Sequence, residues 1–274
     1  MKTAHNGDPI RTALTAVFLV FVVACDFENK PPRNTHPQLK LAHPLTPPIE
    51  NSIDYIRLGS VVPAQKDALW WQRRHDNKVS IAREGGANLI IIGDSLVHNF
   101  EGRGRQIYYL YFGRYNPLNL GFNADLTQNA LWRIQNGEVD GLSPKLAIIM
   151  IGTNNSGRST SSSKSTFMGI SAIVEELRYR LPETKILLLG IFPRGPTKKH
   201  VIRQRNERVN SMLPMLADEK WVFYRDIGSE FLDRKGRLSR NIMYDFLHPT
   251  VKGYQIWAES ISPIVLELMR DTDY

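Results

Sequence analysis

The chain has 274 residues, of which 42% are hydrophobic, so it can bury one substantial core in one or two domains. Its formal net charge of +8 favours anionic partners, but it has no basic stripe with interleaved aromatic residues, so we expect no nucleic-acid partner. The single cysteine excludes an internal disulfide framework.

The amino-terminal segment has the pattern of a lipoprotein-type signal peptide. An apolar run over residues 13–24 follows Lys2 and Arg11 and is too short to cross a bilayer comfortably. It ends in Val-Val-Ala-Cys at Cys25, which resembles the bacterial lipobox, in which the cysteine is lipidated and becomes the mature amino terminus. We therefore expect a signal peptide over residues 1–24 and a membrane anchor through lipidated Cys25, facing the periplasm or exterior of a bacterial cell. An ordinary cleaved signal peptide, giving a secreted protein, and an uncleaved anchor helix are the alternatives.

A proline-rich segment follows the cysteine. Its prolines lie among polar residues, a composition that cannot bury a core and favours extended polyproline geometry: Pro31, Pro32, Pro37, Pro44, Pro47 and Pro48. We expect residues 25–54 to form a semi-rigid tether and residues 55–274 to form one domain.

Short apolar runs alternate with helical patterns through this domain. The runs predict strands at residues 89–92, 117–121, 145–151, 185–192 and 221–227. Helical spacing predicts helices from 67 to 85, after Ser95, and at 125–137, 167–177, 201–217 and 254–268. Uniformly apolar strands that alternate with helices are typical of a doubly wound parallel sheet with helices on both faces.

Ser95 stands at the carboxyl end of the first predicted strand, in Gly93-Asp94-Ser95. Ligands of open α/β sheets bind just outside this end of the strands, and a following helix would direct its N–H groups towards Ser95. Gly121 and Asn154 follow the next two strands, so they are expected at the same edge. An Asp-Ser pair in this position is also typical of a plain turn or helix N-cap.

These positions and a late loop can supply the groups for ester hydrolysis by a serine. His248 can remove the Ser95 proton, and Asp245, three residues earlier, can orient the imidazole and offset its charge. The Ser95 N–H, the Gly121 N–H and the Asn154 side-chain amide can form an oxyanion hole. Taken singly, Asn154 could only brace its turn, and His248 with Asp245 could be a surface pair of little consequence.

Together the blocks resemble those of the SGNH (GDSL) hydrolase superfamily. The matching segments are Gly93-Asp94-Ser95, Asn119-Leu120-Gly121, Gly152-Thr153-Asn154-Asn155 and Asp245-Phe246-Leu247-His248. Residues 131–138, 151–155 and 192–195 are similar to the catalytic subunits of platelet-activating-factor acetylhydrolase Ib and their bacterial relatives. The resemblance implies a flavodoxin-like three-layer α/β/α sandwich with a five-stranded parallel sheet. It also implies hydrolysis of short acyl esters, acetyl above all, on a small molecule or a glycan, with no metal and no cofactor.

One loop departs from this resemblance. Close relatives tend to have Gly-Gly-Asp after the oxyanion glycine, whereas Phe122-Asn123-Ala124-Asp125 follows Gly121 here. The aspartate is retained and the glycines are not, so we expect a stiffer loop and a changed acyl pocket.

Four further residues are candidates for substrate binding. Asp94 and Asp125 lie beside the expected oxyanion donors, although Asp94 is more typical of a residue that bonds the turn backbone. His98 lies one turn beyond Ser95, where it lines the pocket or faces solvent. Arg194 can meet an anionic group of a substrate or be a structural surface arginine.

Two other functions have a basis in the same residues. Asp94, His98, Asp245 and His248 could surround a divalent metal, but their spacing matches no recognised metal motif. A non-catalytic, membrane-tethered protein that binds glycans or lipids on a hydrolase scaffold is the second alternative. The sequence leaves the natural ester open, with acetylated polysaccharide first and a short-acyl lipid second, and a dimer is one option for the oligomeric state.

Overall fold

The computed structural model describes residues 59–270. The expected signal peptide, the lipidation site at Cys25 and the tether over residues 25–54 therefore lie outside the described residues. Among the helices that the structure does describe, none combines the length and apolar character needed to span a bilayer.

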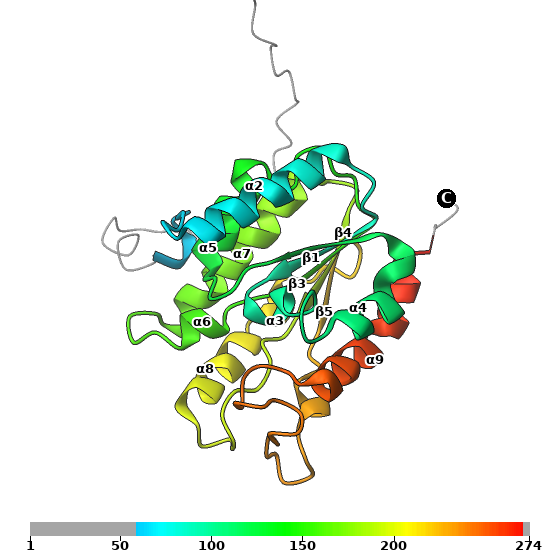
Figure 1. Ribbon diagram of the computed structural model, residues 1–274. Coiled ribbons are helices and arrows are strands. Elements are labelled where there is room, and N and C mark those ends of the chain that lie inside the picture. Colours follow the sequence, from blue (N-terminus) through cyan, green and yellow to red (C-terminus); the bar gives the residue numbers. More distant parts are fainter. Residues whose placement is uncertain (1–58, 271–274) are drawn as a thin grey trace, which may run out of the picture. The chain divides into compact units, whose positions relative to one another are not determined.

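Five parallel strands form a sheet in the order β2-β1-β3-β4-β5, with helices on both faces (Figure 1). The strands are β1 (Leu89–Gly93), β2 (Pro117–Gly121), β3 (Leu146–Met150), β4 (Lys185–Leu189) and β5 (Val222–Arg225). Gly93 pairs with Gly121 on one side and with Met150 on the other, so three strands end at one level. This is the flavodoxin-like order, and the predicted fold class is confirmed.

Helices form the two outer layers. One face carries α2 (Leu69–Glu84), α5 (Thr127–Arg133), α7 (Ser163–Arg180) and α8 (Val201–Asn210). The other carries α3 (Ser95–His98), α4 (Arg105–Phe112) and α9 (Val251–Leu268). The short helix α6 (Thr153–Ser156) follows β3, a π-helical turn spans Ile134–Glu138, and 3₁₀ turns lie at Gly59–Val61, Gly113–Tyr115, Leu213–Leu216 and Gly228–Phe231.

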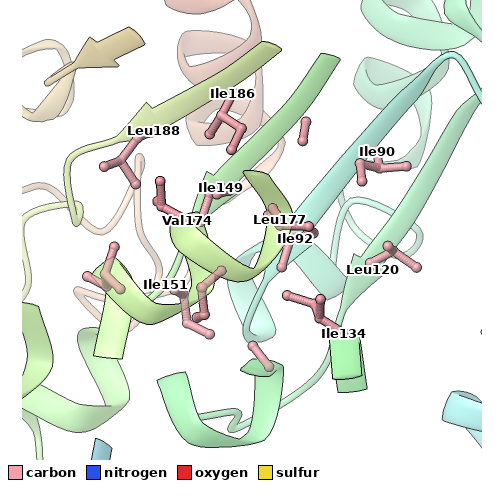
Figure 2. Packing of buried hydrophobic residues seen from close by; sticks show 14 of the residues in the cluster. Ile90, Ile92, Leu120, Ile134, Ile149, Ile151, Val174, Leu177, Ile186 and Leu188 are labelled. Atoms are coloured by element: carbon pink, nitrogen blue, oxygen red, sulfur yellow. The ribbon is translucent and has the colours of Figure 1, made fainter. Parts of the chain in front are cut away.

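Each face of the sheet has its own hydrophobic core. Successive strand residues point to opposite faces, so Ile90 and Ile92 join one core while Leu89 and Ile91 join the other. Figure 2 shows the first core, in which Val174 and Leu177 of α7 lie over residues of β3 and β4 that include Ile149 and Leu188. The two-sided burial explains why the strands read as continuous apolar runs.

Two helical segments differ from their predicted form. The helix expected over 201–217 ends at Asn210 and continues as a 3₁₀ turn, because Pro214 has no N–H to extend the ladder. After Ser95, where we expected a helix, the chain forms two, α3 and α4.

Candidate active site

Ser95, His248 and Asp245 form one hydrogen-bonded chain at the carboxyl edge of the sheet. Ser95 Oγ lies 3.0 Å from His248 Nε2, and His248 Nδ1 lies 2.7 Å from Asp245 Oδ2. Ser95 is the first residue of α3, directly after β1, while the other two lie on the loop before α9. The structure therefore brings together the three side chains that the sequence pattern predicts to meet.

The loop that carries His248 is shaped by Asp245. Asp245 Oδ1 accepts the N–H groups of Leu247 at 3.1 Å and of His248 at 2.7 Å, which leaves Oδ2 for the imidazole. Partial burial acts to raise the pKa of Asp245, but the hydrogen bonds from His248 outweigh it and hold that pKa below its ordinary value. The ring of Tyr244 stacks on His248 with a centroid separation of 5.9 Å. An ionised carboxylate thus fixes both the loop and the imidazole.

Asp94 lies beneath this chain and is fully buried. Its Oδ1 accepts the N–H of Leu96 at 3.0 Å, and Oδ2 has no hydrogen-bond partner in the described structure. Burial raises the pKa of Asp94 to about 7, against the smaller opposing effect of the Leu96 hydrogen bond. Asp94 therefore braces the turn and offers no surface to a substrate, contrary to the suggestion that it binds one.

The backbone N–H of Gly121 does not have the orientation that the sequence suggested. It donates to Asn119 Oδ1 at 2.8 Å, so it is already bound. A Cβ at Gly121 would lie 2.2 Å from the backbone nitrogen of His98. The missing side chain therefore makes room for α3 to pack against β2, and not for a substrate. Asn119 Nδ2 also donates to the Val97 carbonyl at 2.7 Å. Sequence reasoning missed this buried brace, although an asparagine inside an apolar strand was its signal.

Ala124 is the better candidate for an oxyanion donor. It has a left-handed φ of 60°, which alanine rarely adopts. Within residues 59–270 its N–H and that of Ser95 have no hydrogen-bond acceptor. Asn154 Nδ2 donates to the Asp125 carbonyl at 2.9 Å, so the predicted amide donor lies against the same loop. The signal for Ala124 was its place before Asp125, where close relatives have the second glycine of Gly-Gly-Asp.

Two cations hold this loop by its carbonyl groups. Lys66 Nζ donates to the Ala124 oxygen at 2.7 Å and lies 3.0 Å from Asp125 Oδ1. Arg74 Nε donates to the Gly121 oxygen at 3.0 Å. Lys66 thereby holds the peptide that follows Ala124, and Arg74 holds the peptide between Gly121 and Phe122 at the start of the loop.

His98 is bonded to the same loop. Its Nδ1 accepts the N–H of Asn123 at 3.1 Å, and its ring lies 6.4 Å from that of Trp70. Burial, followed by the positive charge of Arg74, lowers the pKa of His98 to about 4. Since Nδ1 accepts, the ring is neutral with its proton on Nε2. His98 therefore braces the loop, whereas the sequence left open whether it lines the pocket or faces solvent.

Asp125 lies at the centre of a buried ion network beneath the loop. Its carboxylate is fully buried and accepts hydrogen bonds from Trp71 Nε1 at 2.7 Å and Arg133 Nε at 2.9 Å. Arg133 also pairs with Glu138, and its guanidinium lies 3.9 Å from the ring centroid of Phe122. Asp125 therefore supports the loop from below and does not face a substrate, in contrast to its suggested binding role.

Arg194 lies on the segment after β4 and contacts the turn after β3. It is half-buried, and its Nη1 donates to the Thr153 carbonyl at 3.2 Å. Burial lowers its pKa, while Asp94 and Asp245 act in the opposite direction, so it lies within the field of both carboxyl groups. Of the four candidate binding residues, Arg194 and His98 are partly exposed and keep N–H donors without an acceptor in the described part of the chain.

A metal site finds no support in the described residues. Between 59 and 270, no three His, Cys, Asp or Glu side chains gather closely enough to hold an ion. Asp94 and His98, which the metal alternative requires, are engaged instead with the backbone of Leu96 and Asn123.

Residues 91–256 match the model of the GDSL-like lipase/acylhydrolase family. The chain belongs to this family. The acylhydrolase is also 32% identical over 206 residues to the rat (Rattus norvegicus) platelet-activating factor acetylhydrolase IB subunit alpha2, which covers 74% of this chain and 86% of the relative. It is a carboxylic ester hydrolase, and the predicted SGNH superfamily is confirmed.

Solved structures share the fold of this acylhydrolase. A GDSL-like lipase from Bacteroides thetaiotaomicron aligns with a TM-score of 0.58 at 16% identity, covering 71% of this chain and 97% of that one. An acetylxylan esterase from Geobacillus stearothermophilus aligns with a TM-score of 0.54 at 16% identity, covering 69% and 96%.

Proposed function

We propose that this acylhydrolase cleaves short acyl esters, acetyl above all, with Ser95 as nucleophile, His248 as general base and Asp245 as the group that orients the base. The observation that carries the proposal is the pair of consecutive hydrogen bonds, 3.0 Å from Ser95 to His248 and 2.7 Å from His248 to Asp245. A hydroxyl, an imidazole and a carboxylate in this order are the parts that serine acyl transfer requires.

The reaction follows from the proton positions. Ser95 Oγ attacks the ester carbonyl as its proton passes to His248 Nε2, and Asp245 offsets the imidazolium charge. The oxyanion accepts hydrogen bonds from the N–H groups of Ser95 and Ala124 and from Asn154 Nδ2. The C–O bond to the alcohol breaks as His248 returns the proton to the leaving oxygen. Water then attacks the acyl-serine with His248 again as base, which releases the acid and restores Ser95.

Acetyl esters are the first choice of substrate. The rat relative is named for an acetylhydrolase, and one structure of the same fold is an acetylxylan esterase. The two names share the acetyl group and differ in the alcohol. An acetylated glycan comes first because the amino-terminal pattern favours a location outside the cytoplasm, and a short-acyl lipid comes second.

The nucleophile is tested by Ser95→Ala in the full-length protein. Turnover of a small acetyl ester should fall by roughly four orders of magnitude or more, with an unchanged circular dichroism spectrum. Ser229→Ala, at an exposed serine whose hydroxyl contacts only Glu230, is the matched control and should keep wild-type activity. If Ser95→Ala keeps most of its activity, the nucleophile is wrong. A wild-type protein that binds the ester without turnover would instead be the non-catalytic binder.

Membrane attachment through Cys25 is part of the same proposal. It is supported by the apolar run over residues 13–24 and by Val-Val-Ala-Cys at its end. Cys25→Ser should move the protein from the membrane fraction to the soluble fraction of a bacterial host and abolish its labelling by a fatty-acid analogue. Unchanged labelling and fractionation would contradict lipidation at this cysteine.

A further inference from the structure

A pocket lies against the catalytic histidine on the side away from the oxyanion donors. Its volume is about 360 Å³, and it is lined by Asn99, Arg103, Tyr244, His248, Pro249 and Tyr254. None of the residues 121–125 and neither Asn154 nor Lys66 contributes to the lining. We call it the Arg103 pocket.

The pocket and the oxyanion loop belong to opposite faces of the sheet. Tyr254 lies on α9, and Arg103 lies on the turn before α4, which packs against α9 on the second core. The oxyanion loop instead packs on Trp71 of α2 and Arg133 of α5, on the first face. An ester held at Ser95 with its carbonyl oxygen in the loop therefore extends its remainder away from that loop.

That remainder is the alcohol portion. His248 must return a proton to the leaving oxygen, so the leaving oxygen has to lie beside its Nε2. His248 also lines the pocket whereas Ser95 does not, so the pocket receives the part of the alcohol that extends past the imidazole. The lining also carries polar groups and an arginine, which suit an alcohol of a sugar or glycerol better than an acetyl methyl group.

Arg103 gives the pocket its charge. Its guanidinium lies 4.0 Å from the ring centroid of Tyr244, which holds it over the pocket. Over residues 59–270 no carboxylate lies within ion-pair distance of it. Glu101, the acidic residue next to it in sequence, is already paired with Arg74 at 2.8 Å and with Lys78 at 2.6 Å.

A second arginine adds to this field. Arg240 donates from Nη1 to the Tyr244 carbonyl at 2.9 Å and lies 4.4 Å from the ring centroid of Phe246. It also has no carboxylate partner in the described part of the chain. Arg240 lies outside the pocket lining, and the one carboxylate of the adjoining segment 244–248, that of Asp245, is bonded to His248, so Arg103 is the charged group that the pocket itself presents.

We infer that the Arg103 pocket binds an anionic oxygen group, a carboxylate or a phosphate, on the alcohol portion of the ester. The inference rests on the proposed function and specifies its substrate class as acetyl esters of acidic alcohols. A planar guanidinium fixed on an aromatic ring offers parallel N–H donors to either anion. An acidic sugar would present a carboxylate to the pocket, and a glycerol phosphate would present a phosphate.

The test compares charged and uncharged esters that are otherwise matched. One pair is monoacetylated glucuronic acid and its methyl ester; the other is acetylated glycerol phosphate and acetylated glycerol. For the wild-type full-length protein, kcat/KM should be about tenfold higher for the charged member of at least one pair, as a charge-assisted hydrogen bond would give. The pair with the larger ratio identifies the anion. Added salt should reduce the ratio.

Three variants separate a specific contact from general attraction. Arg103→Gln should bring the ratio close to one, and Arg103→Lys should keep part of it because the charge is retained. Arg105→Gln removes an equal charge two residues away, at a side chain that lies outside the pocket and 5.9 Å from the ring centroid of Tyr109. It should keep the wild-type ratio.

Three results would overturn the inference. They are a wild-type ratio near one for both pairs, an equal loss of the ratio in Arg105→Gln, and an equal fall on charged and uncharged esters in Arg103→Gln. Turnover of the uncharged esters by the wild type is read separately. Its absence would reject the proposed esterase function, whereas its presence without a charge ratio rejects only the anion site.

Discussion

The two sides of Ser95 are built on different principles. On the oxyanion side, Asp125 has a fully buried side chain and lies among Trp71, Lys66 and Arg133. On the histidine side, Asp245 is 40% exposed and its partners belong mostly to its own loop. Both sides use an aspartate, but Asp125 is buried between two cations and Asp245 is exposed to solvent.

This difference matches what each side has to do. Donors that stabilise an oxyanion act best when they are fixed before charge appears, and a buried ion network fixes them. In the proposed mechanism the imidazole changes its charge in each half-reaction, and an ionised carboxylate beside it and solvent at its exposed loop stabilise the charged form. The oxyanion side of Ser95 is therefore the rigid one, and the histidine side is the one exposed to solvent.

The largest expected effect comes from Arg133→Met, which removes the cation between Asp125 and Glu138. The buried Glu138 would lose its ion-pair partner and the buried Asp125 would keep only Lys66, so the free energy of unfolding should fall by about 3–5 kcal/mol. Denaturant titration measures this loss. Arg237→Met, at an exposed pair with Asp233, is the control and should leave the free energy of unfolding close to the wild-type value. Similar losses in both variants would contradict the contrast between the two sides.

The next effect concerns catalysis on the rigid side. Asn154→Ala should lower kcat for an acetyl ester by roughly 10²–10³-fold, because it removes one preorganised oxyanion donor. Stability should change less than in Arg133→Met, since the Asn154 amide bonds only one carbonyl of the fold, that of Asp125. A fall of only a few-fold in kcat would show that Asn154 supports the loop without touching the oxyanion.

The smallest effect is the pH dependence of stability that the buried Asp94 causes. The folded-state pKa of Asp94 is about 7 and its ordinary value is 3.8, so between these values the folded protein holds a proton that the unfolded chain releases. Asp94 therefore lowers stability as pH rises through this window. Asp94→Asn should be stabilised relative to wild type by a margin that grows from pH 4 to 7, by at least about 1 kcal/mol, and then stays constant.

The neighbouring His98 changes stability with pH in the opposite direction. Its folded-state pKa of about 4 lies below the ordinary 6.5, so the folded protein loses stability as pH falls from 6.5 to 4. In Asp94→Asn the slope from His98 should remain, and the free energy of unfolding should rise with pH more steeply than in wild type. Reversible unfolding at several pH values measures both slopes. A pH-independent difference between the variant and wild type would contradict the burial effect on Asp94.

The sequence predicted the features that depend on local pattern. Apolar runs located the five strands, and the order of motifs brought Ser95, Asp245 and His248 together. These predictions succeed because consecutive residues determine the apolar pattern of a strand and the turn that ends it.

The failures concern groups whose role depends on distant side chains. Asn119 stands two residues before Gly121 and was a signal in the sequence, but the orientation of its side chain also depends on its bond to the Val97 carbonyl, 22 residues away. The left-handed conformation of Ala124 accompanies a bond to Lys66, which lies 58 residues away in the chain. The enclosure of Asp125 likewise depends on Arg133 and on a tryptophan from another helix.

The short stretch before α2 sets the true starting point of the catalytic unit. Ser60 lies in a buried polar cluster with Asn155 and Ser165, and Lys66 bonds the loop at Ala124. A shortened enzyme must therefore retain Ser60 and Lys66, even though the first long helix starts only at Leu69. A chain that begins at Leu69 would keep the whole sheet and the Ser95, His248 and Asp245 side chains. It would lose the Lys66 hydrogen bond to the Ala124 carbonyl, and with it one support of the proposed oxyanion donor.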